Sequence, residues 1–445
     1  MSQLSRRRFL KTTAAASLAT VPIGVGVGRS GILAPGSAPA RPVESESDPT
    51  ATGLDAAHDR DSRGRRGVAT PSQEDPLGIR HEFPVCEEQT YLNTASQGPL
   101  SRTAYAAFED YAREKRLMRR PGQLSDAEAS ARTRFARLFG ADEDEIGFLY
   151  STSDGENLVT SALDWRAGDN VVVDELHFVT TFVLYRELER RHGIELRIVP
   201  APGGRPTLED YAARTDDRTR LVSVAWVSNR NGYRHDLAAL ADLAHARGAY
   251  LYADAIQALG AFDTNLHDEG VDFACGNGYK WLFAEFGCAP FYVRREHLEW
   301  LRPDRWGHGQ VAETLADFRF RLRETAEKYE HANIAYGSTA VLDAALSLLE
   351  DVGLARIEEH TVALAAELRA GVADLGIDPF TPEGNRSPIV SFRHGLDPVA
   401  LAAALEAENV AVTFQEDGRL VRAAVAMFNT RADVDRLLAA LAAQV

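Results

Sequence analysis

Lysine is scarce in this chain of 445 residues. Four lysines occur, at positions 11, 115, 280 and 328, while arginine supplies the rest of the 49 basic residues. The protein therefore uses arginine wherever a positive charge alone is needed. Lys280 lies in the stretch GNGYKW, residues 276–281, which has little surface character, so its presence needs a chemical reason that arginine does not meet.

Clustered positive charge is also missing. The formal net charge is −16, and no run of Lys and Arg with interleaved aromatic residues occurs, which argues against nucleic acid as a partner. With 45% hydrophobic residues, the chain is long enough to bury the core of one large domain and a smaller one.

Cysteine is nearly absent as well. The three cysteines, Cys86, Cys275 and Cys288, are far apart and odd in number. They show neither CxxC spacing nor a Cys/His ligand pattern. The sequence therefore predicts neither a disulfide framework nor a zinc site, and it indicates no metal ligands.

The N-terminus carries an export pattern. Residues 5–11, SRRRFLK, precede a weakly apolar stretch rich in Ala and Gly, and they resemble the Ser-Arg-Arg-x-Phe-Leu-Lys pattern of twin-arginine signals. A basic, disordered N-terminus is the alternative, and Pro22 and several glycines argue against a transmembrane helix. We therefore predict a signal region at residues 1–34, recognised by the twin-arginine translocase, and an extracellular, cell-surface or periplasmic location.

Strands and helices alternate through the middle of the chain. After residues 35–80, whose Pro, Gly, Ser, Asp and Arg predict a disordered linker, residues 102–139 have a helical pattern broken at residues 121–122. The alternation that follows predicts an α/β protein with a mostly parallel, doubly wound sheet. The expected strands are residues 145–150, 170–175, 194–200, 220–228, 249–255 and 273–278, and the helices between them are residues 154–163, 180–193 and 235–248.

A second unit is predicted from residue 336 onward. It begins with a helix at 337–353, contains strands at 388–394 and 420–426, and closes with a helix at 430–444. The predicted organisation is therefore the signal region, the linker, an N-terminal arm with a large domain at 81–335, and a small C-terminal α+β domain at 336–445.

Three polar groups follow strand ends, where α/β sheets bind their ligands. Asp254 ends a nearly continuous apolar run, and it is either a turn cap or a buried partner for a ligand. Residues 151–155, STSDG, either cap the helix they precede or hold a phosphate at its N-terminus. Lys280 is either a snorkelling or ion-paired side chain, or a desolvated amine that forms a Schiff base.

In order and spacing, these segments resemble the class V aminotransferase family of pyridoxal-phosphate enzymes over roughly residues 83–445. The similar motifs are YLNTASQGPL, YSTSDGENLV, LHFVTTFVLY, VSNRNG, DAIQALG, GNGYKW and VRAAVAMFNTRADVDRLL. The resemblance implies the fold-type I architecture, with a mixed, mostly parallel seven-stranded sheet flanked by helices in the large domain and a small second domain. It also implies pyridoxal 5'-phosphate as cofactor and a homodimer with active sites at the interface.

The resemblance assigns a role to each matching residue. Lys280 would be the Schiff-base lysine and Asp254 the carboxylate at the pyridine nitrogen, which makes them the catalytic pair, and Arg422 would bind the substrate carboxylate. The other implied cofactor contacts are Thr152, Ser153, Asn277 and Tyr279 at the phosphate, Phe178 over the pyridine ring with His177 as the alternative, Asn229 and Gln257 near the phenolic oxygen, and Asn333 at the neighbouring subunit's phosphate.

This chemistry explains why a lysine is kept. Arginine stays protonated and is a poor nucleophile, whereas an imine needs a primary amine that can lose its proton. A carboxylate at the pyridine nitrogen makes the ring an electron acceptor, and the freed amine of Lys280 can then move protons. Arg422 can hold a carboxylate through two parallel hydrogen bonds.

Some positions depart from the family pattern. Desulfurase members have a nucleophilic cysteine shortly before the C-terminal arginine, but residues 410–422, VAVTFQEDGRLVR, contain none. This favours an epimerase-like or lyase-like branch, although Gln415 stands where those branches usually have arginine. The Gly-Thr pair with which many relatives reach the neighbouring phosphate is Ala332-Asn333 here.

Three functions remain open on the sequence. The first is an exported pyridoxal-phosphate enzyme that acts on an amino acid or small amine by transamination, epimerisation or elimination. The second is a kynureninase-like carbon–carbon lyase, because GYKWL and RWGHG (305–309) are similar to that enzyme, with ordinary loop packing as the alternative role for Trp306 and His308. The third is a secreted binding protein without turnover, against which the combination of Asp254, Lys280 and Arg422 argues.

Overall fold

The computed structural model describes residues 68–72, 74–118 and 126–445. The predicted signal region, residues 1–34, and most of the predicted linker lie outside these described residues. At the end of the predicted linker, Leu77 and Ile79 are buried, and the Asp75 carboxylate accepts hydrogen bonds from the amides of Ile79 and Arg80. Packed sequence therefore begins before residue 81, because these two apolar side chains join the core.

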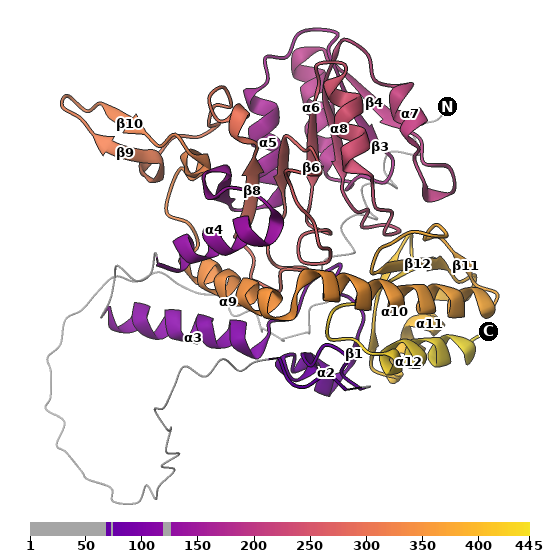
Figure 1. The fold of residues 1–445 in the computed structure, drawn as a ribbon. Coiled ribbons are helices and arrows are strands. Elements are labelled where there is room, and N and C mark those ends of the chain that lie inside the picture. The colour runs from indigo at the N-terminus through magenta and orange to yellow at the C-terminus, as the bar shows by residue number, and fades with distance from the viewer. Residues whose placement is uncertain (1–67, 73, 119–125) are drawn as a thin grey trace, which may run out of the picture. The chain divides into compact units, whose positions relative to one another are not determined.

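A seven-stranded sheet is the central element of residues 146–293 (Figure 1). Its strand order is β2-β8-β7-β6-β5-β3-β4, and β8 alone runs antiparallel to its neighbours. The strands are β2 Ile146–Leu149, β3 Asn170–Asp174, β4 Glu195–Val199, β5 Thr219–Ala225, β6 Tyr250–Asp254, β7 Phe273–Cys275 and β8 Ala289–Val293. The mostly parallel sheet confirms the predicted α/β class.

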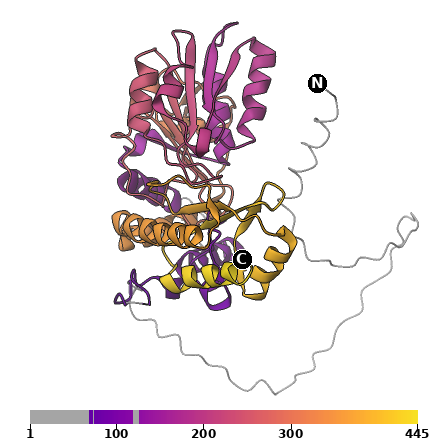
Figure 2. The ribbon, with the colours of Figure 1, turned by 90° about the vertical axis from the view of Figure 1, so that its right-hand side faces the viewer.

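Helices cover both faces of this sheet (Figure 2). They are α5 Thr152–Ala162, α6 Thr181–His192, α7 Leu208–Ala212 and α8 Leu237–His245. Strands β3 and β8 are buried along their whole length, as expected of strands covered on both sides. Strand β8 was not predicted, because Pro290 has no amide hydrogen and argues against a central strand.

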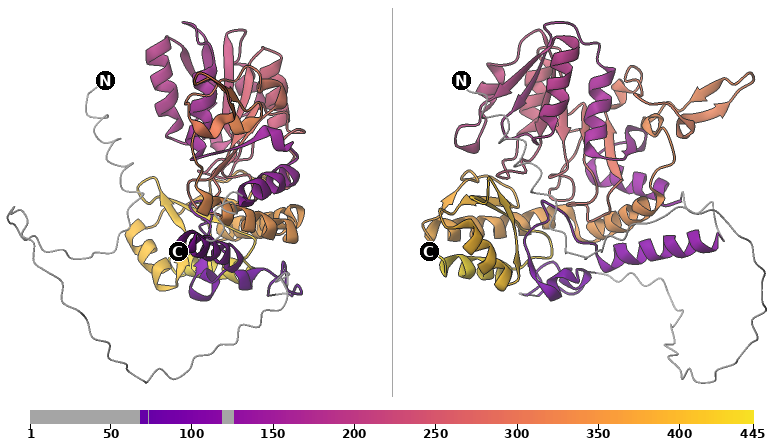
Figure 3. Two further views of the ribbon diagram at one scale, coloured as in Figure 1. Left: turned by 90° about the vertical axis from the view of Figure 1, so that its left-hand side faces the viewer. Right: turned by 180° about the vertical axis from the view of Figure 1, so that it is seen from behind.

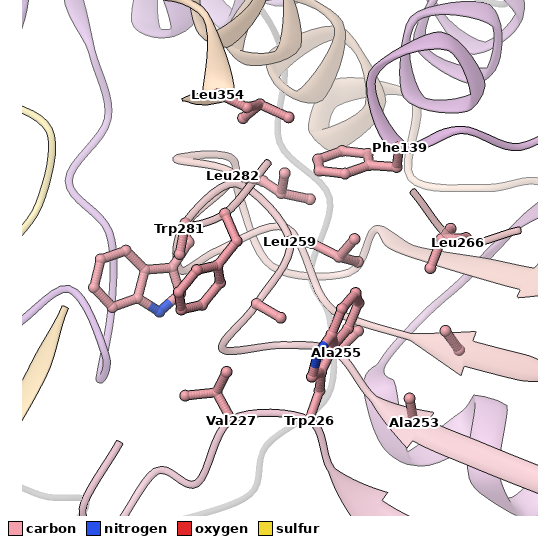
Figure 4. Packing of buried hydrophobic residues seen from close by; sticks show 14 of the residues in the cluster. Phe139, Trp226, Val227, Ala253, Ala255, Leu259, Leu266, Trp281, Leu282 and Leu354 are labelled. Carbon is pink, nitrogen blue, oxygen red and sulfur yellow. The ribbon is translucent and has the colours of Figure 1, made fainter. Parts of the chain in front are cut away.

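The main hydrophobic cluster contains residues from the segments that follow β5, β6 and β7. Figure 4 shows Trp226, Ala255, Leu259, Trp281 and Leu282 within this cluster. Ala255 directly follows residue 254, and Trp281 directly follows residue 280. Packing of these apolar neighbours therefore fixes the backbone that carries the two polar side chains predicted to be catalytic.

The C-terminal part has its own sheet, which is antiparallel with the order β11-β12-β15-β14. Its elements are α9 Tyr336–Val352, α10 Leu354–Asp374, β11 Asp378–Pro379, β12 Ile389–Arg393, α11 Pro398–Ala407, β14 Thr413–Gln415, β15 Leu420–Ala424 and α12 Arg431–Ala442. The predicted helix at 337–353, the two strands and the closing helix are present, while α10 and α11 were not predicted. The domain boundary at residue 335 stays a prediction.

The N-terminal arm packs on the C-terminal part. Strand β1 Thr90–Tyr91 pairs in parallel with β13 Val410–Ala411. The arm's helices are α2 Val85–Glu88, α3 Arg102–Leu117 and α4 Asp126–Phe139, of which α3 and α4 both contact α9. Short 3-10 helices occur at Arg80–Glu82, Glu143–Glu145, Pro202–Gly204, Arg295–His297, His308–Gln310 and Ala326–Tyr329.

A hairpin of β9 Val311–Thr314 and β10 Phe320–Leu322 extends away from the sheet (Figures 1 and 3). It was not predicted, and the side chain of Phe318 at its turn is 94% exposed. Among the described residues, no helix combines the length and the apolar character needed to cross a bilayer.

Candidate active site

One pocket collects nearly all of the predicted site residues. It lies at the carboxyl ends of β5 and β6 and at the N-terminus of α5, and its volume is about 120 Å³. Among the residues predicted to contact the cofactor or substrate, Asn333, Arg422 and the alternative ring contact His177 are not on its wall. The lining residues are Ser151, Thr152, Ser153, Glu156, Phe178, Thr181, Ala225, Val227, Asn229, Asp254, Ile256, Gln257, Asn277, Tyr279 and Lys280.

Lys280 is the cationic side chain of this pocket, and it is buried, with 8% exposure. Burial and, secondarily, the positive charge of Arg422 lower the pKa of its amine to about 7, although the carboxylate of Asp254 partly opposes the shift. A large fraction of the amine is therefore neutral near neutral pH. This is the property that an amine nucleophile needs and that arginine cannot supply.

Asp254 is the last residue of β6 and faces the same pocket. Its Oδ1 accepts a hydrogen bond from the amide of Ile256 at 3.1 Å. One oxygen of the carboxylate therefore caps the turn, which was one of the two roles considered from sequence. Burial raises the pKa of this carboxyl group, an effect that the hydrogen bond from the Ile256 amide partly offsets. A cationic partner in the pocket would reduce the cost of keeping this buried group ionised.

Two of the residues predicted to bind the phosphate, Thr152 and Ser153, begin α5. Ser151 caps the helix by accepting from the amide of Asp154, so the capping role falls on Ser151. Thr152 and Ser153 line the pocket instead. The Thr152 hydroxyl accepts a hydrogen bond from the amide of Asn277 at 3.0 Å, which joins the helix to the segment after β7.

Three amide side chains lie on the wall, and two of them, Asn229 and Gln257, differ in how they are engaged. Asn229 Oδ1 is buried and has no hydrogen-bond partner among the described residues. Gln257 accepts a hydrogen bond from Trp281 Nε1 at 2.7 Å and donates one to the carbonyl of Ala95 at 2.8 Å. One N–H of Gln257 is left for a ligand, and its two hydrogen bonds tie the N-terminal arm to the lysine segment.

Phe178 lines the pocket and is 41% exposed, whereas His177 is buried outside the pocket wall. The imidazole of His177 contacts the hydroxyl of Ser223 at 3.1 Å. This arrangement favours the predicted register, in which Phe178 and not His177 faces a bound ring.

Arg422, in the middle of β15, lies behind the pocket wall. Its guanidinium donates to the carbonyl of Asn229 at 2.8 Å, to Thr413 Oγ1 at 3.2 Å and to the hydroxyl of Ser96. Burial lowers its pKa to about 10. Its Nε has no partner among the described residues. Two parallel hydrogen bonds to a carboxylate therefore require that Ser96 or Thr413 gives up its contact.

Asn333 lies in a different hollow, together with Ala332, Arg305 and Asp154. Its Oδ1 contacts His308 Nε2 at 3.1 Å, and Trp306 is 64% exposed. Neither Trp306 nor His308 lines the pocket of Lys280. The roles predicted for these residues remain predictions.

All three cysteine thiols have raised pKa values in this fold. Burial raises the pKa of Cys86 and of Cys288 to about 12, and it raises that of Cys275 well above its usual range. A reactive cysteine needs the opposite shift, since the thiolate is the nucleophile. The described segment before Arg422 also has no cysteine.

Several residues of the site were not identified from sequence. Glu156 and Thr181 line the pocket, and Ser96 and Thr413 hold Arg422. Glu156 could have been noticed from sequence, because it is a charged residue close to the apolar residues Leu158 and Val159, which are both buried on α5. No local pattern marks Ser96, because its contact with Arg422 joins positions far apart in the chain.

The residues present fit pyridoxal phosphate. A buried amine of lowered pKa suits an aldehyde, and a carboxylate at a strand end suits a pyridine nitrogen. A helix N-terminus with two hydroxyls suits a phosphate. The unpartnered Asn229 Oδ1, and Asn277 Oδ1, which also lacks a partner among the described residues, leave polar groups free for a ligand.

Comparisons with known proteins point to one family. The family model described as aminotransferase class-V matches residues 105–437. A "Probable cysteine desulfurase" of Methanothermobacter thermautotrophicus is 28% identical over 390 residues, covering 81% of this chain and 95% of the relative. The "Uncharacterized aminotransferase YcbU" of Bacillus subtilis is 26% identical over 373 residues, covering 83% and 98%.

Solved structures confirm the fold. The apo cysteine desulfurase of Thermococcus onnurineus superposes with a TM-score of 0.76 at 24% identity, covering 83% of this chain and 98% of that one. A lysine-to-alanine mutant of C-DES, with glycine covalently linked to its PLP cofactor, gives 0.78 at 21% identity, covering 84% and 100%. The predicted fold-type I architecture is thus confirmed.

Proposed function

Since this chain belongs to the class V aminotransferase family of pyridoxal-phosphate enzymes, we propose that it processes an amino acid or small amine and that Lys280 carries the cofactor. One observation supports this above all others. The amine of Lys280 lies in the same pocket as the Asp254 carboxylate, and its pKa is lowered to about 7. Packing alone gives no reason to bury an amine there, because burying a charge is costly.

Bound pyridoxal phosphate supplies a reactive aldehyde and an electron-accepting ring. Lys280 contributes a neutral amine as nucleophile, and the same amine can afterwards move a proton at the α-carbon of the substrate. Asp254 holds a proton at the ring nitrogen in this proposal. Thr152 and Ser153 bind the phosphate at the N-terminus of α5, where the helix dipole favours an anion.

Arg422 orients the substrate through its carboxylate. Since its Nη2 already contacts Ser96 and Thr413, substrate binding replaces at least one of these hydroxyl contacts. The guanidinium remains anchored at the carbonyl of Asn229.

The lack of a thiolate bears on the reaction. Relatives are named cysteine desulfurases, so sulfur amino acids are the first substrates to test. The buried thiols of raised pKa do not favour sulfur transfer to a protein cysteine. We therefore propose transamination, epimerisation or elimination, with any leaving sulfur released from the substrate into solution.

Borohydride treatment followed by peptide mapping tests the cofactor site. A pyridoxyl group is expected on Lys280 and not on Lys328, which is a matched internal control because it is also buried with a lowered pKa but lies outside the pocket. Lys280→Arg keeps the charge and should lose the modification. A modified Lys328, or an unmodified Lys280 after incubation with excess cofactor, contradicts the proposal.

A substrate screen separates the proposed reactions. Common amino acids, cysteine, cystine and kynurenine are added to the cofactor-loaded protein, and absorbance and products are followed. Product that depends on a keto acid supports transamination, and free sulfide or pyruvate supports elimination. Cleavage of kynurenine alone supports the kynureninase-like alternative, and a loaded protein inert to every amine supports the binding protein.

We also propose export by the twin-arginine route, which rests on the resemblance of residues 5–11. Replacing Arg6→Lys together with Arg7→Lys keeps the charge but removes the paired arginines that the pathway reads. The double variant is expected to stay inside the producing cell, while the parent chain is exported. Export of both to the same extent contradicts the proposal.

A homodimer is proposed on the family resemblance. Three exposed aromatic side chains support it: Tyr150 at 74%, Phe286 at 47% and Trp306 at 64%. Tyr150 lines the same hollow as Asn333, so a second subunit covering it would bury apolar surface. Light scattering of the loaded protein should give twice the chain mass, and a monomer would contradict this.

A further inference from the structure

A buried carboxylate on the pocket wall has no role in the chemistry described so far. The side chain of Glu156 on α5 is 7% exposed. It accepts hydrogen bonds from Thr181 Oγ1 at 2.9 Å, from the Tyr185 hydroxyl at 2.6 Å and from the Ser223 hydroxyl at 2.6 Å. An ionised group at this depth is costly unless it is well bonded, and these three donors satisfy it.

A chain of hydrogen bonds connects Glu156 through Ser223 and His177 to Phe178 on the pocket wall. Because Ser223 donates its proton to Glu156, its oxygen acts as acceptor toward His177 Nε2, 3.1 Å away. That nitrogen therefore carries the proton of the neutral imidazole. His177 Nδ1 is left as acceptor, and the amide of Phe178 donates to it at 2.8 Å.

The same carboxylate also holds the other end of this segment. Thr181 is the first residue of α6, and its hydroxyl is bonded to Glu156. Phe178 thus lies in a short loop whose two ends, His177 and Thr181, are both tied to one buried acid. Its own side chain, at 41% exposure, has little packing of its own to fix it.

We propose that Glu156 is a positioning residue of the pocket: through Ser223 and His177 it fixes the main chain of Phe178, whose side chain forms part of the pocket wall. The inference rests on the proposed function in that Phe178 faces pyridoxal phosphate. On the His177 side of the loop Glu156 acts on Phe178 through the serine and the histidine, and on the other side it holds Thr181 directly. Removal of the serine therefore releases the His177 side of the loop.

Two substitutions distinguish positioning from general stabilisation. Ser223→Ala cuts the path between Glu156 and His177. Tyr185→Phe removes a hydroxyl that donates to the same oxygen, Glu156 Oε1, but leaves the path intact. A purely structural role for the acid predicts similar consequences for both substitutions, because each deletes one buried hydrogen bond to one carboxylate.

The first measurement uses the protein without added cofactor. Selective ¹⁵N labelling of histidine and phenylalanine reports the His177 tautomer and the Phe178 amide, assigned with His177→Asn and Phe178→Ala. The wild type and Tyr185→Phe are expected to show His177 protonated on Nε2. Ser223→Ala should show a mixture of tautomers and a displaced Phe178 amide signal, and an unchanged His177 in this variant overturns the inference.

The second measurement is the affinity for pyridoxal phosphate. Ser223→Ala should weaken binding about tenfold, and Tyr185→Phe should change it by less than about twofold. In a Phe178→Ala background, Ser223→Ala should add less than about twofold, because its effect passes through Phe178. Equal effects of the two variants, or an undiminished effect without Phe178, overturn the inference.

The two proposals fail separately. A wild-type protein that takes up no pyridoxyl group on Lys280 contradicts the proposed function, and the tautomer of His177 still decides the role of Glu156. A loaded wild type in which Ser223→Ala and Tyr185→Phe behave alike leaves the enzyme function standing and removes the positioning role.

Discussion

The backbones of Gly98 and Lys280 lie in direct contact. The Gly98 amide donates to the carbonyl of Tyr279 at 2.8 Å, and a Cβ at position 98 would lie 2.0 Å from the carbonyl oxygen of Lys280. Glycine is required here because of this close approach. The N-terminal arm therefore helps to hold the segment that carries the reactive amine.

Gly98→Ala is expected to lower the free energy of unfolding by about 2 kcal/mol or more, because the contacted atoms are backbone and cannot rotate away. It should also reduce incorporation of the pyridoxyl group on Lys280. Gly203→Ala is the control: a Cβ there meets nothing within 4 Å, and only the positive φ of 62° opposes it, at about 1 kcal/mol. Urea denaturation compares the two, and equal losses contradict the contact.

The pH dependence of cofactor incorporation should follow the ionisation of Lys280. In the wild type, the rate should rise as the amine loses its proton, with a midpoint near its pKa of about 7. Arg422 lowers this pKa, so Arg422→Gln should move the midpoint upward. Asp254 raises it, so Asp254→Asn should move the midpoint downward. Stopped-flow absorbance measures the rates, and shifts in the same direction contradict the electrostatic assignment.

The same shift predicts how stability depends on pH. The pKa of Lys280 is lower in the folded chain than its ordinary value of 10.5, so between about pH 7 and 10 the unfolded chain binds more protons. The contribution of Lys280 to the free energy of unfolding therefore rises with pH between about pH 7 and 10. Lys280→Met should flatten this part of the stability curve, measured by denaturation without cofactor, while Lys280→Met with an unchanged slope is the contrary result.

A buried carboxylate far from the pocket provides a second pH-dependent element. Asp272 contacts His245 Nε2 at 2.8 Å and His297 Nε2 at 2.6 Å. Burial by itself would raise the pKa of Asp272, but the hydrogen bonds from both histidines and from the Leu251 amide lower it to about 2. Asp272→Asn is therefore expected to cost about 3 kcal/mol or more of stability, measured near neutral pH.

The pKa of His245 is shifted in the opposite direction to that of Asp272. Its hydrogen bond to Asp272 raises its pKa above the ordinary 6.5, so its contribution is full below that value and is lost as the pH rises through the raised value. His245→Gln should therefore lose more stability at about pH 5.5 than at about pH 8.5. Thermal unfolding at both values checks this, and a larger loss at the higher value refutes it.

Thiol chemistry should be dispensable for turnover. Cys86 is the most accessible cysteine, and the raised pKa values of all three thiols predict slow alkylation of the folded protein. Treatment with iodoacetamide is expected to change turnover of a sulfur amino acid by less than about twofold, and Cys86→Ala should behave the same way. Inactivation with stoichiometric labelling of one cysteine would instead indicate sulfur transfer through the protein.

Much of the fold could be predicted because its signals are local. The apolar run that ends at Asp254 predicts a strand, and Gly193, with φ of 68°, ends α6 where expected. Strand β8 was missed because Pro290 contradicts the local pattern, although the sheet provides neighbours on both sides. Helix α10 was missed because Gly353 marks an end without showing that a second helix begins at once.

The sequence by itself determined the α/β class and the grouping of Lys280, Asp254 and the start of α5, because strand periodicity and motif spacing place these residues at one edge of a parallel sheet. Only the tertiary structure decided which partners each side chain has: Arg422 against Ser96, Asn333 in a separate hollow, and Glu156 bonded to Ser223. Such contacts join positions far apart in the chain. They depend on how whole elements pack, and no local pattern of residues encodes them.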